Sequence, residues 1–151
     1  MKKIWFLLVL LGLGYVFYLS IYKLPYFSDE GTFSYTYVFF NPISTNEDKL
    51  LTLVDKLKTL SEDKSEFDEN ILIDNVFIKN KTATISLKGK NLYSSSYNEI
   101  RIIRHLAETV RVNFKDIEYL KIKEDNRSIF QHIDINKKFE IKGAANLGNL
   151  K

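Results

Sequence analysis

The sequence predicts an α+β protein: a small mixed sheet with two helices packed on one face, preceded by one transmembrane helix. Three observations indicate this class. An uncharged apolar stretch fills residues 4–21, two amphipathic helical patterns start near residues 46 and 97, and short runs of β-branched and aromatic residues surround them. Helices that cover one face of a small sheet form a common layered architecture.

The apolar stretch is long enough to cross a bilayer. Residues 4–21 contain no charge and no proline, and twelve of these eighteen residues are Leu, Ile, Val or Phe. As a helix they would rise about 27 Å, close to the ~30 Å hydrocarbon core, and would favour insertion by about 4 to 7 kcal/mol. We therefore expect residues 1–23 to be a transmembrane anchor, whose membrane-spanning residues include Ile4, Trp5, Leu8, Leu11, Val16 and Ile21.

The flanking charges predict the orientation of this anchor. Lys2 and Lys3 precede it and Lys23 alone follows it, which places the N-terminus in the cytoplasm and the rest of the chain outside. This predicts a single-pass protein of the cytoplasmic membrane with an extracytoplasmic domain, on the periplasmic or cell-surface side. A cleaved signal peptide is the alternative, although cleavage after the small residues Gly12 and Gly14 would leave an apolar N-terminus. A lipoprotein signal is excluded because the chain has no cysteine.

The remainder of the chain is electrically neutral. The net charge of +3 equals the three lysines of residues 1–23, which contain no acid, so the 19 acidic residues are matched by basic ones. A nucleic-acid partner would need a basic surplus on the folded part, so we exclude it. Without cysteine, the 14% aromatic residues must supply the core. We assign residues 33–142 to one domain and residues 143–151, which lack enough apolar residues to pack, to a flexible tail.

A linker, a strand and a helix follow the anchor. Residues 24–32 contain one proline and one glycine and are interpreted as the linker. Aromatic residues alternate in part with smaller ones in residues 33–40, which predicts a strand whose aromatic side could pair with another chain. A capping box from Ser44 to Glu47 then starts a helix over residues 46–60.

Residues 71–79 and 82–88 predict a hairpin with Asn80 and Lys81 as its turn. Asn80 tolerates the left-handed backbone conformation that such a turn requires. The register that makes the turn tight also aligns apolar residues on one side of the hairpin. The aligned pairs are Ile78 with Ala83 and Val76 with Ile85.

The last part of the domain predicts a helix and two strands. A second capping box, from Ser96 to Glu99, starts the clearest amphipathic helix, over residues 97–112. Strands are predicted over residues 119–124 and 129–135. The apolar face of the helix comprises Tyr97, Ile100, Ile103, Leu106, Ala107, Val110 and Phe114.

Three short segments carry a resemblance to a known family. They are Ala83-Thr84-Ile85-Ser86-Leu87-Lys88 in the hairpin, Glu108-Thr109-Val110-Arg111 with Asn113-Phe114 in the helix, and Ile117-Glu118-Tyr119-Leu120-Lys121-Ile122 in the next strand. These segments resemble the GerMN domain, named from bacterial sporulation and spore germination proteins. The chain departs from the family pattern at Ser86, at Lys88 and at Leu60-Ser61-Glu62. The resemblance implies a non-catalytic, membrane-anchored module of the cell envelope that acts through protein contacts.

The residue types that carry chemistry indicate no enzyme class. The chain has two histidines, no phosphate-binding glycine loop and no metalloprotease motif. We interpret His105 and His132 as solvent-exposed side chains, the first on a helix and the second in a strand. Ser61 to Lys64 matches the Ser-x-x-Lys acylation motif by chance, and no catalytic, metal or cofactor site is predicted. An enzyme stays the second alternative, to be revived by a cluster of His132 with loop carboxylates in a pocket. The acidic run that lacks the spacing of a calcium loop is Asp63, Glu66, Asp68 and Glu69.

One charged surface suggests a partner-docking face. Arg101, Arg104, His105 and Arg111 share the polar side of the second helix with Glu108. Ion pairs from Glu108 to its neighbours would make an ordinary salt-linked surface, and the alternative is a face that docks an acidic partner or an anionic wall polymer. The sequence therefore predicts a non-enzymatic, membrane-anchored protein that binds other envelope proteins, with peptidoglycan or glycan binding as the alternative.

Overall fold

The chain forms an α+β protein with two sheets, not the single sheet predicted. The computed structural model describes residues 2–28, 32–60, 67–68, 70–92, 94–125 and 128–142. The Ser61–Lys64 motif, most of the acidic run and the tail over residues 143–151 therefore lie outside the described residues. The elements are α1 (Lys2–Leu19), β1 (Ile21–Phe27), β2 (Phe33–Phe39), α2 (Asn46–Lys58), β3 (Ile71–Lys79), β4 (Thr82–Gly89), α3 (Ser96–Asn113), β5 (Tyr119–Glu124) and β6 (Phe139–Glu140).

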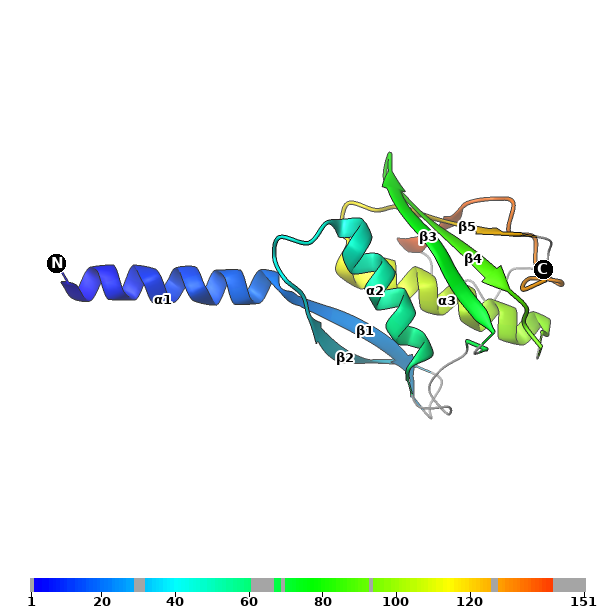
Figure 1. Cartoon of the computed structure of the whole chain (residues 1–151), viewed down its shortest axis with the longest axis horizontal. Coiled ribbons are helices and arrows are strands. Elements are labelled where there is room, and N and C mark those ends of the chain that lie inside the picture. The colour runs from blue at the N-terminus through cyan, green and yellow to red at the C-terminus, as the bar shows by residue number, and fades with distance from the viewer. Residues whose placement is uncertain are drawn as a thin grey trace.

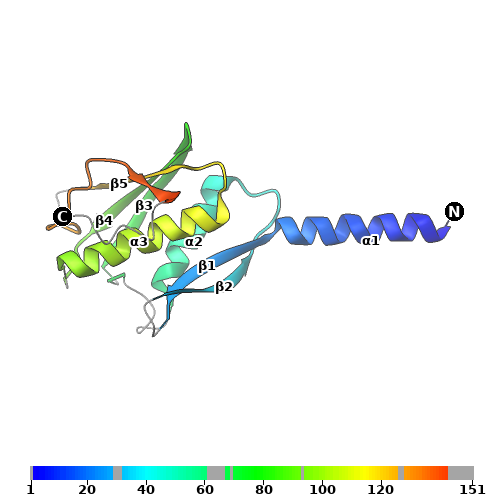
Figure 2. The same cartoon turned by 180° about the vertical axis from the view of Figure 1, so that it is seen from behind.

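The helices α2 and α3 pack against both sheets (Figure 1). One sheet has four strands in the order β3-β4-β5-β6, and the other is the two-stranded ribbon β1-β2. α2 contacts β3 and β1, and α3 contacts β5 and β1, so each helix is covered on two sides. Figure 2 shows the same arrangement from behind. The pair β4-β5 is parallel and the other pairs of the large sheet are antiparallel, so this sheet is mixed, as predicted.

One apolar core joins the helices to the large sheet. Most of the predicted apolar face of α3 is buried, but Tyr97 is 67% exposed and Ile102, outside the predicted face, is fully buried. Burying the apolar side chains of the helices and the sheet drives the layers together. The fully buried core residues include Leu50, Leu53 and Leu57 of α2, Ile71, Ile85, Leu87, Leu120 and Ile122 of the sheet, and Ile102, Ile103 and Leu106 of α3.

The predicted hairpin is confirmed with its register. β3 and β4 are antiparallel, and Val76 lies opposite Ile85 while Ile78 lies opposite Ala83. Asn80 and Lys81 both have positive φ, 49° and 59°, as a two-residue turn that matches the strand twist requires.

The two amphipathic helices of the domain are confirmed, but each cap is displaced by one residue. The side chain of Thr45, not Ser44, caps α2 by accepting a hydrogen bond from the backbone of Asp48. The side chain of Ser95, not Ser96, caps α3 by accepting from the backbone of Asn98. The observed ends of both helices lie within two residues of the predicted ends.

Strand β1 occupies residues that were assigned to the end of the anchor and to the linker. It pairs antiparallel with β2, from Ile21 opposite Phe39 to Phe27 opposite Phe33. Leu24 and Phe27 are buried, because the ribbon packs against the helices. The composition suggested a linker because of Pro25, which a strand accepts when its missing N–H lies on the free edge.

The prediction of a transmembrane helix is wrong. Within the described residues, no helix combines the length and the apolar character needed to cross a membrane. α1 extends away from the domain and ends at Leu19, and the apolar stretch then continues as β1, in which Ile21 lies (Figure 1). The predicted spanning residues Ile4, Trp5, Leu8, Leu11 and Val16 are exposed on α1. The predicted localisation, a single-pass protein with an extracytoplasmic domain, is contradicted by the same finding.

Candidate functional site

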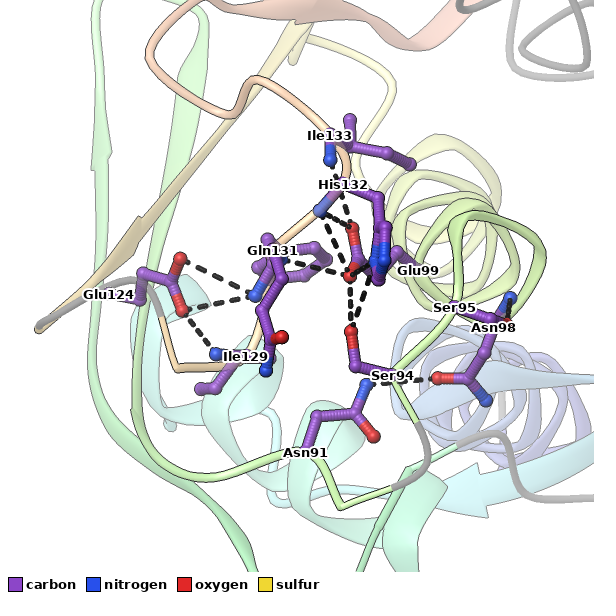
Figure 3. A network of polar contacts seen from close by, with 11 residues as sticks. Asn91, Ser94, Ser95, Asn98, Glu99, Glu124, Ile129, Gln131, His132 and Ile133 are labelled. Atoms are coloured by element: carbon purple, nitrogen blue, oxygen red, sulfur yellow. Dashed lines mark hydrogen bonds and ion pairs between the residues drawn. The ribbon is translucent and has the colours of Figure 1, made fainter.

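A buried carboxylate in the first turn of α3 organises the best-connected polar cluster of the domain (Figure 3). Glu99 is 0% exposed. It accepts hydrogen bonds from the backbone N–H groups of Gln131 (2.9 Å), His132 (3.0 Å) and Ile133 (3.0 Å). The Ser94 hydroxyl donates to it at 2.5 Å, and His132 Nδ1 lies 2.9 Å from it. Because Ser95 caps the helix, Glu99 is free to turn inward.

A second carboxylate holds the preceding part of the same loop. Glu124, at the end of β5, accepts from the backbone N–H of Ile129 at 2.7 Å and of Phe130 at 3.2 Å. Together with Glu99 it binds five consecutive amides, those of residues 129–133. The prediction of a strand over residues 129–135 is therefore wrong, since these N–H groups bond carboxylates and not a neighbouring strand. The last strand of the sheet is β6, which pairs with β5.

The hydrogen bonds determine the charge state of Glu99. Burial alone would raise its pKa, but the bonds from Ser94, His132 and the backbone of Gln131 outweigh burial and lower the pKa below its ordinary value. The carboxylate is thus ionised at neutral pH, and its charge strengthens each bond that it accepts.

The cluster contains serine, histidine and a carboxylate, the residue types of nucleophilic catalysis. His132 also borders a cavity of about 190 Å³ together with Glu124 and Asp134. Such a cluster is the observation that would favour the alternative hypothesis of an enzyme. The geometry does not fit that chemistry. Ser94 Oγ lies 3.3 Å from His132 Nδ1, the nitrogen that already faces Glu99, whereas a relay needs the two partners on different ring nitrogens. The Ser94 proton is directed to Glu99, so the cluster holds the loop and does not activate the serine. No group of metal-binding side chains occurs among the described residues.

The predicted docking residues lie beside the ribbon, and they do not share one exposed surface. His105 is 1% exposed, so its interpretation as a solvated side chain is wrong. Its ring packs against Phe27 at 4.6 Å and Phe33 at 5.4 Å between ring centroids. The guanidinium groups of Arg101 and Arg104 lie over the Phe27 ring at 4.4 Å and 5.4 Å.

Neither ring nitrogen of His105 has a hydrogen-bond partner within the part of the chain that the structure describes. Burial, followed by the positive charges of Arg101 and Arg104, lowers the pKa of His105 to about 3, although Glu108 opposes this change. His105 is therefore a neutral aromatic ring of the interface between α3 and the ribbon at physiological pH.

Glu108 and Arg111 form the expected ion pair, and the ribbon adds a third partner. Arg111 donates two hydrogen bonds to the Glu108 carboxylate, at 2.6 Å and 2.7 Å. The Tyr35 hydroxyl of β2 donates to the same carboxylate at 2.5 Å. Arg104 acts on Glu108 only through its charge, which helps to lower the pKa of that carboxyl group. The pairing of Glu108 with Arg111 therefore also fixes β2.

A wide hollow lies where the ribbon meets the end of α3. Its volume is about 710 Å³, and it combines tyrosines with amide and charged side chains. Its polar and aromatic lining residues are Tyr18, Tyr22, Lys23, Tyr37, Asn46, Asn113, Lys115 and Asp116. Sequence reasoning missed this hollow because it assigned residues 18–23 to the anchor and did not bring them next to α3.

Two solved structures with a similar fold are GerMN domains. No protein-family model and no curated protein matches this chain. The first GerMN domain of the sporulation protein GerM from Bacillus subtilis is 15% identical, covers 72% of this chain and 85% of its own, and has a TM-score of 0.53. The structure of the tandem GerMN domains of the same protein is 14% identical and has a TM-score of 0.54. The match covers 72% of this chain and 40% of the tandem-domain chain.

The folded part of this chain is a GerMN-like domain. A structure named "Putative Lipoprotein from Clostridium perfringens" is also similar, with 16% identity, a TM-score of 0.51, and coverage of 86% of this chain and 94% of that one. The two GerMN structures confirm the predicted resemblance at the level of the fold.

Replacing Glu99 by Gln should lower the free energy of unfolding of the GerMN-like domain by about 3 kcal/mol at pH 7, because an amide cannot accept from all the donors that surround it. The folded-state pKa of Glu99 is lowered, so its contribution is present above the ordinary value of 4.5 and is lost as the pH falls through the folded value. The difference between the two proteins should therefore shrink between pH 7 and pH 3 in urea unfolding. Glu118→Gln, which removes an exposed pair with Lys81, is the control and should change stability far less than Glu99→Gln does. Equal stability of Glu99→Gln and wild type at pH 7 would contradict this role.

Replacing His105 by Phe should reduce the loss of stability on mild acidification. The unfolded chain binds a proton at His105 near pH 6.5 while the folded chain does so only near pH 3, so the wild type is destabilised as the pH falls between these values. From pH 7 to pH 5 the protonation of His105 in the unfolded chain lowers the free energy of unfolding of the wild type by about 2 kcal/mol, and the variant should not show this loss. Urea unfolding of both proteins at pH 7 and pH 5 measures the loss of stability. An equal loss in both proteins would show that His105 is not buried in the neutral form.

Proposed function

We propose that the GerMN-like domain is a non-enzymatic protein-interaction module of the envelope or sporulation type, which docks an acidic partner beside α3. The observation that carries this proposal is the stacking of Arg101 and Arg104 on the ribbon. The ring of Phe27 lies under both guanidinium groups, and Arg101 also donates to the Tyr97 hydroxyl at 3.0 Å. Tyr97 itself is 67% exposed.

This arrangement favours binding for two physical reasons. A guanidinium that is held over an aromatic ring has lost part of its rotational freedom before a partner arrives, which lowers the entropy cost of association. Arginine and tyrosine are also the residue types that most often dominate binding energy. Arg111 and His105 support this surface from within the protein. Arg111 is paired with Glu108, and His105 is covered by the ribbon.

Charge reversal tests this proposal. The double variant Arg101→Glu/Arg104→Glu should lose, by tenfold or more, the partners that proximity labelling from the wild-type domain identifies in living cells. The matched control is Lys121→Glu/Lys123→Glu, which changes the same number of charges on β5 of the large sheet. Circular dichroism of both variants verifies that they fold. An unchanged partner set in the Arg101/Arg104 variant would remove the docking role.

A second candidate is glycan binding, and the hollow between the ribbon and α3 favours it. Exposed tyrosine rings offer apolar faces to sugar rings, and the nearby amide and charged groups offer hydrogen bonds. In sedimentation with purified sacculi, Tyr37→Ala should reduce binding, whereas Tyr119→Ala, on the far sheet, should not. If the wild-type protein does not sediment with the sacculi, glycan binding is excluded.

A further inference from the structure

The strand β2 has one free edge. The backbone N–H of Phe40 donates to Ser20, so the ladder between the strands joins the even-numbered residues, such as Tyr22 with Val38. The odd-numbered residues of β2 therefore direct their backbone groups away from β1. These are Phe33, Tyr35, Tyr37 and Phe39, and no backbone partner for them occurs in the described ranges.

Side chains cap two other edges, those of β1 and β3. On β1, the Asn113 side chain accepts from the Lys23 N–H and donates to the Lys23 carbonyl, at 2.7 Å each, and Pro25 offers no N–H at all. On β3, the Ile78 N–H donates to Glu47 at 3.3 Å, and a bulge lies between Ile73 and Asn75. Such caps and bulges prevent another strand from pairing. β2 has none of these devices, and its sequence, Phe-Ser-Tyr-Thr-Tyr-Val-Phe, contains no charge.

The sequence of β2 is complementary to itself in one antiparallel register. If two copies meet with a two-fold axis at Thr36, then Phe33 lies opposite Phe39 of the second copy and Tyr35 lies opposite Tyr37. All four residues have their backbone groups on the free edge, so each pair can exchange two hydrogen bonds. Aromatic residues face aromatic residues across the strands, and no like charges meet.

We propose that β2 pairs with β2 of a second copy of this chain in this register, so that the two ribbons join into one four-stranded sheet. Tyr37 and Phe39 are 59% and 60% exposed, so the aromatic pairs would bury surface that is open in the single chain. Arg104 lies over the Phe33 ring at 5.7 Å, but within the described residues neither Arg101 nor Arg104 bonds the free backbone edge of β2, and the inference does not depend on the docking of an acidic partner.

Disulfide trapping tests this pairing in the full chain, which has no cysteine of its own. Thr36 would face its own copy across the axis as a non-hydrogen-bonded pair, where the side chains are closest. Thr36→Cys should therefore give a disulfide-linked dimer under mild oxidation. The control is Thr52→Cys, an exposed position on α2 that does not belong to β2. Association through any other surface, including the exposed side chains of α1, would not favour the first variant over the second.

A second substitution tests the register. Adding Tyr37→Pro to Thr36→Cys removes an N–H on the free edge and leaves the ladder to β1 intact, so the linked dimer should decrease by tenfold or more. Equal crosslinking of the Thr36 and Thr52 variants would overturn the proposal, and so would crosslinking that survives the proline. Arg101→Glu/Arg104→Glu in the Thr36→Cys chain should crosslink at the original rate, which separates this inference from the proposed docking function.

Discussion

The side chain of Asn113 takes the place of a neighbouring strand for β1. It accepts from the N–H of Lys23 and donates to the carbonyl of the same residue, and a further bond to the Thr109 carbonyl fixes its rotamer on α3. The ribbon is thereby attached to the end of α3. This attachment determines where α1 ends, because residues that continue the apolar stretch must leave the helix to pair with β2. It also covers His105 and Glu108, whose polar groups would otherwise face water.

The opposite end of α3 is fixed by charge. Glu99 is buried among backbone N–H groups and the Ser94 hydroxyl, so the loop over residues 129–133 is held without regular secondary structure. A buried carboxylate is tolerated only when its lone pairs are occupied, and here five donors surround it. α3 is anchored to the ribbon at one end and to this loop at the other, so it relates the two sheets together with α2, which contacts β3 and β1.

Local patterns predicted the elements, and long-range contacts decided the rest. The hairpin and both domain helices followed from periodicity and turn chemistry, because the residues that determine them lie close together in sequence. The capping residues could be predicted only to within one residue, since neighbouring hydroxyls at positions 44–45 and 94–96 compete. The role of Glu99 could not be predicted, as it depends on a loop about thirty residues away. β1 was missed because an apolar run and a proline masked a strand whose partner is β2. Because β1 was missed, His105 and Glu108 were predicted to lie on an exposed surface, which the ribbon in fact covers.

Glu99, His105 and Glu108 of α3 are therefore used within the protein, and the surfaces proposed for partners lie on the ribbon side. Tyr37 belongs to two of them, since its backbone lies on the free edge of β2 and its side chain borders the hollow beside α3. A strand added to β2 would fix the position of Tyr37 and thus one wall of the hollow. A ligand in the hollow that requires another position of this ring would, by reciprocity, weaken the pairing of the strands. Strand pairing and occupancy of the hollow are consequently linked through one side chain, and each can be measured in the presence of the other.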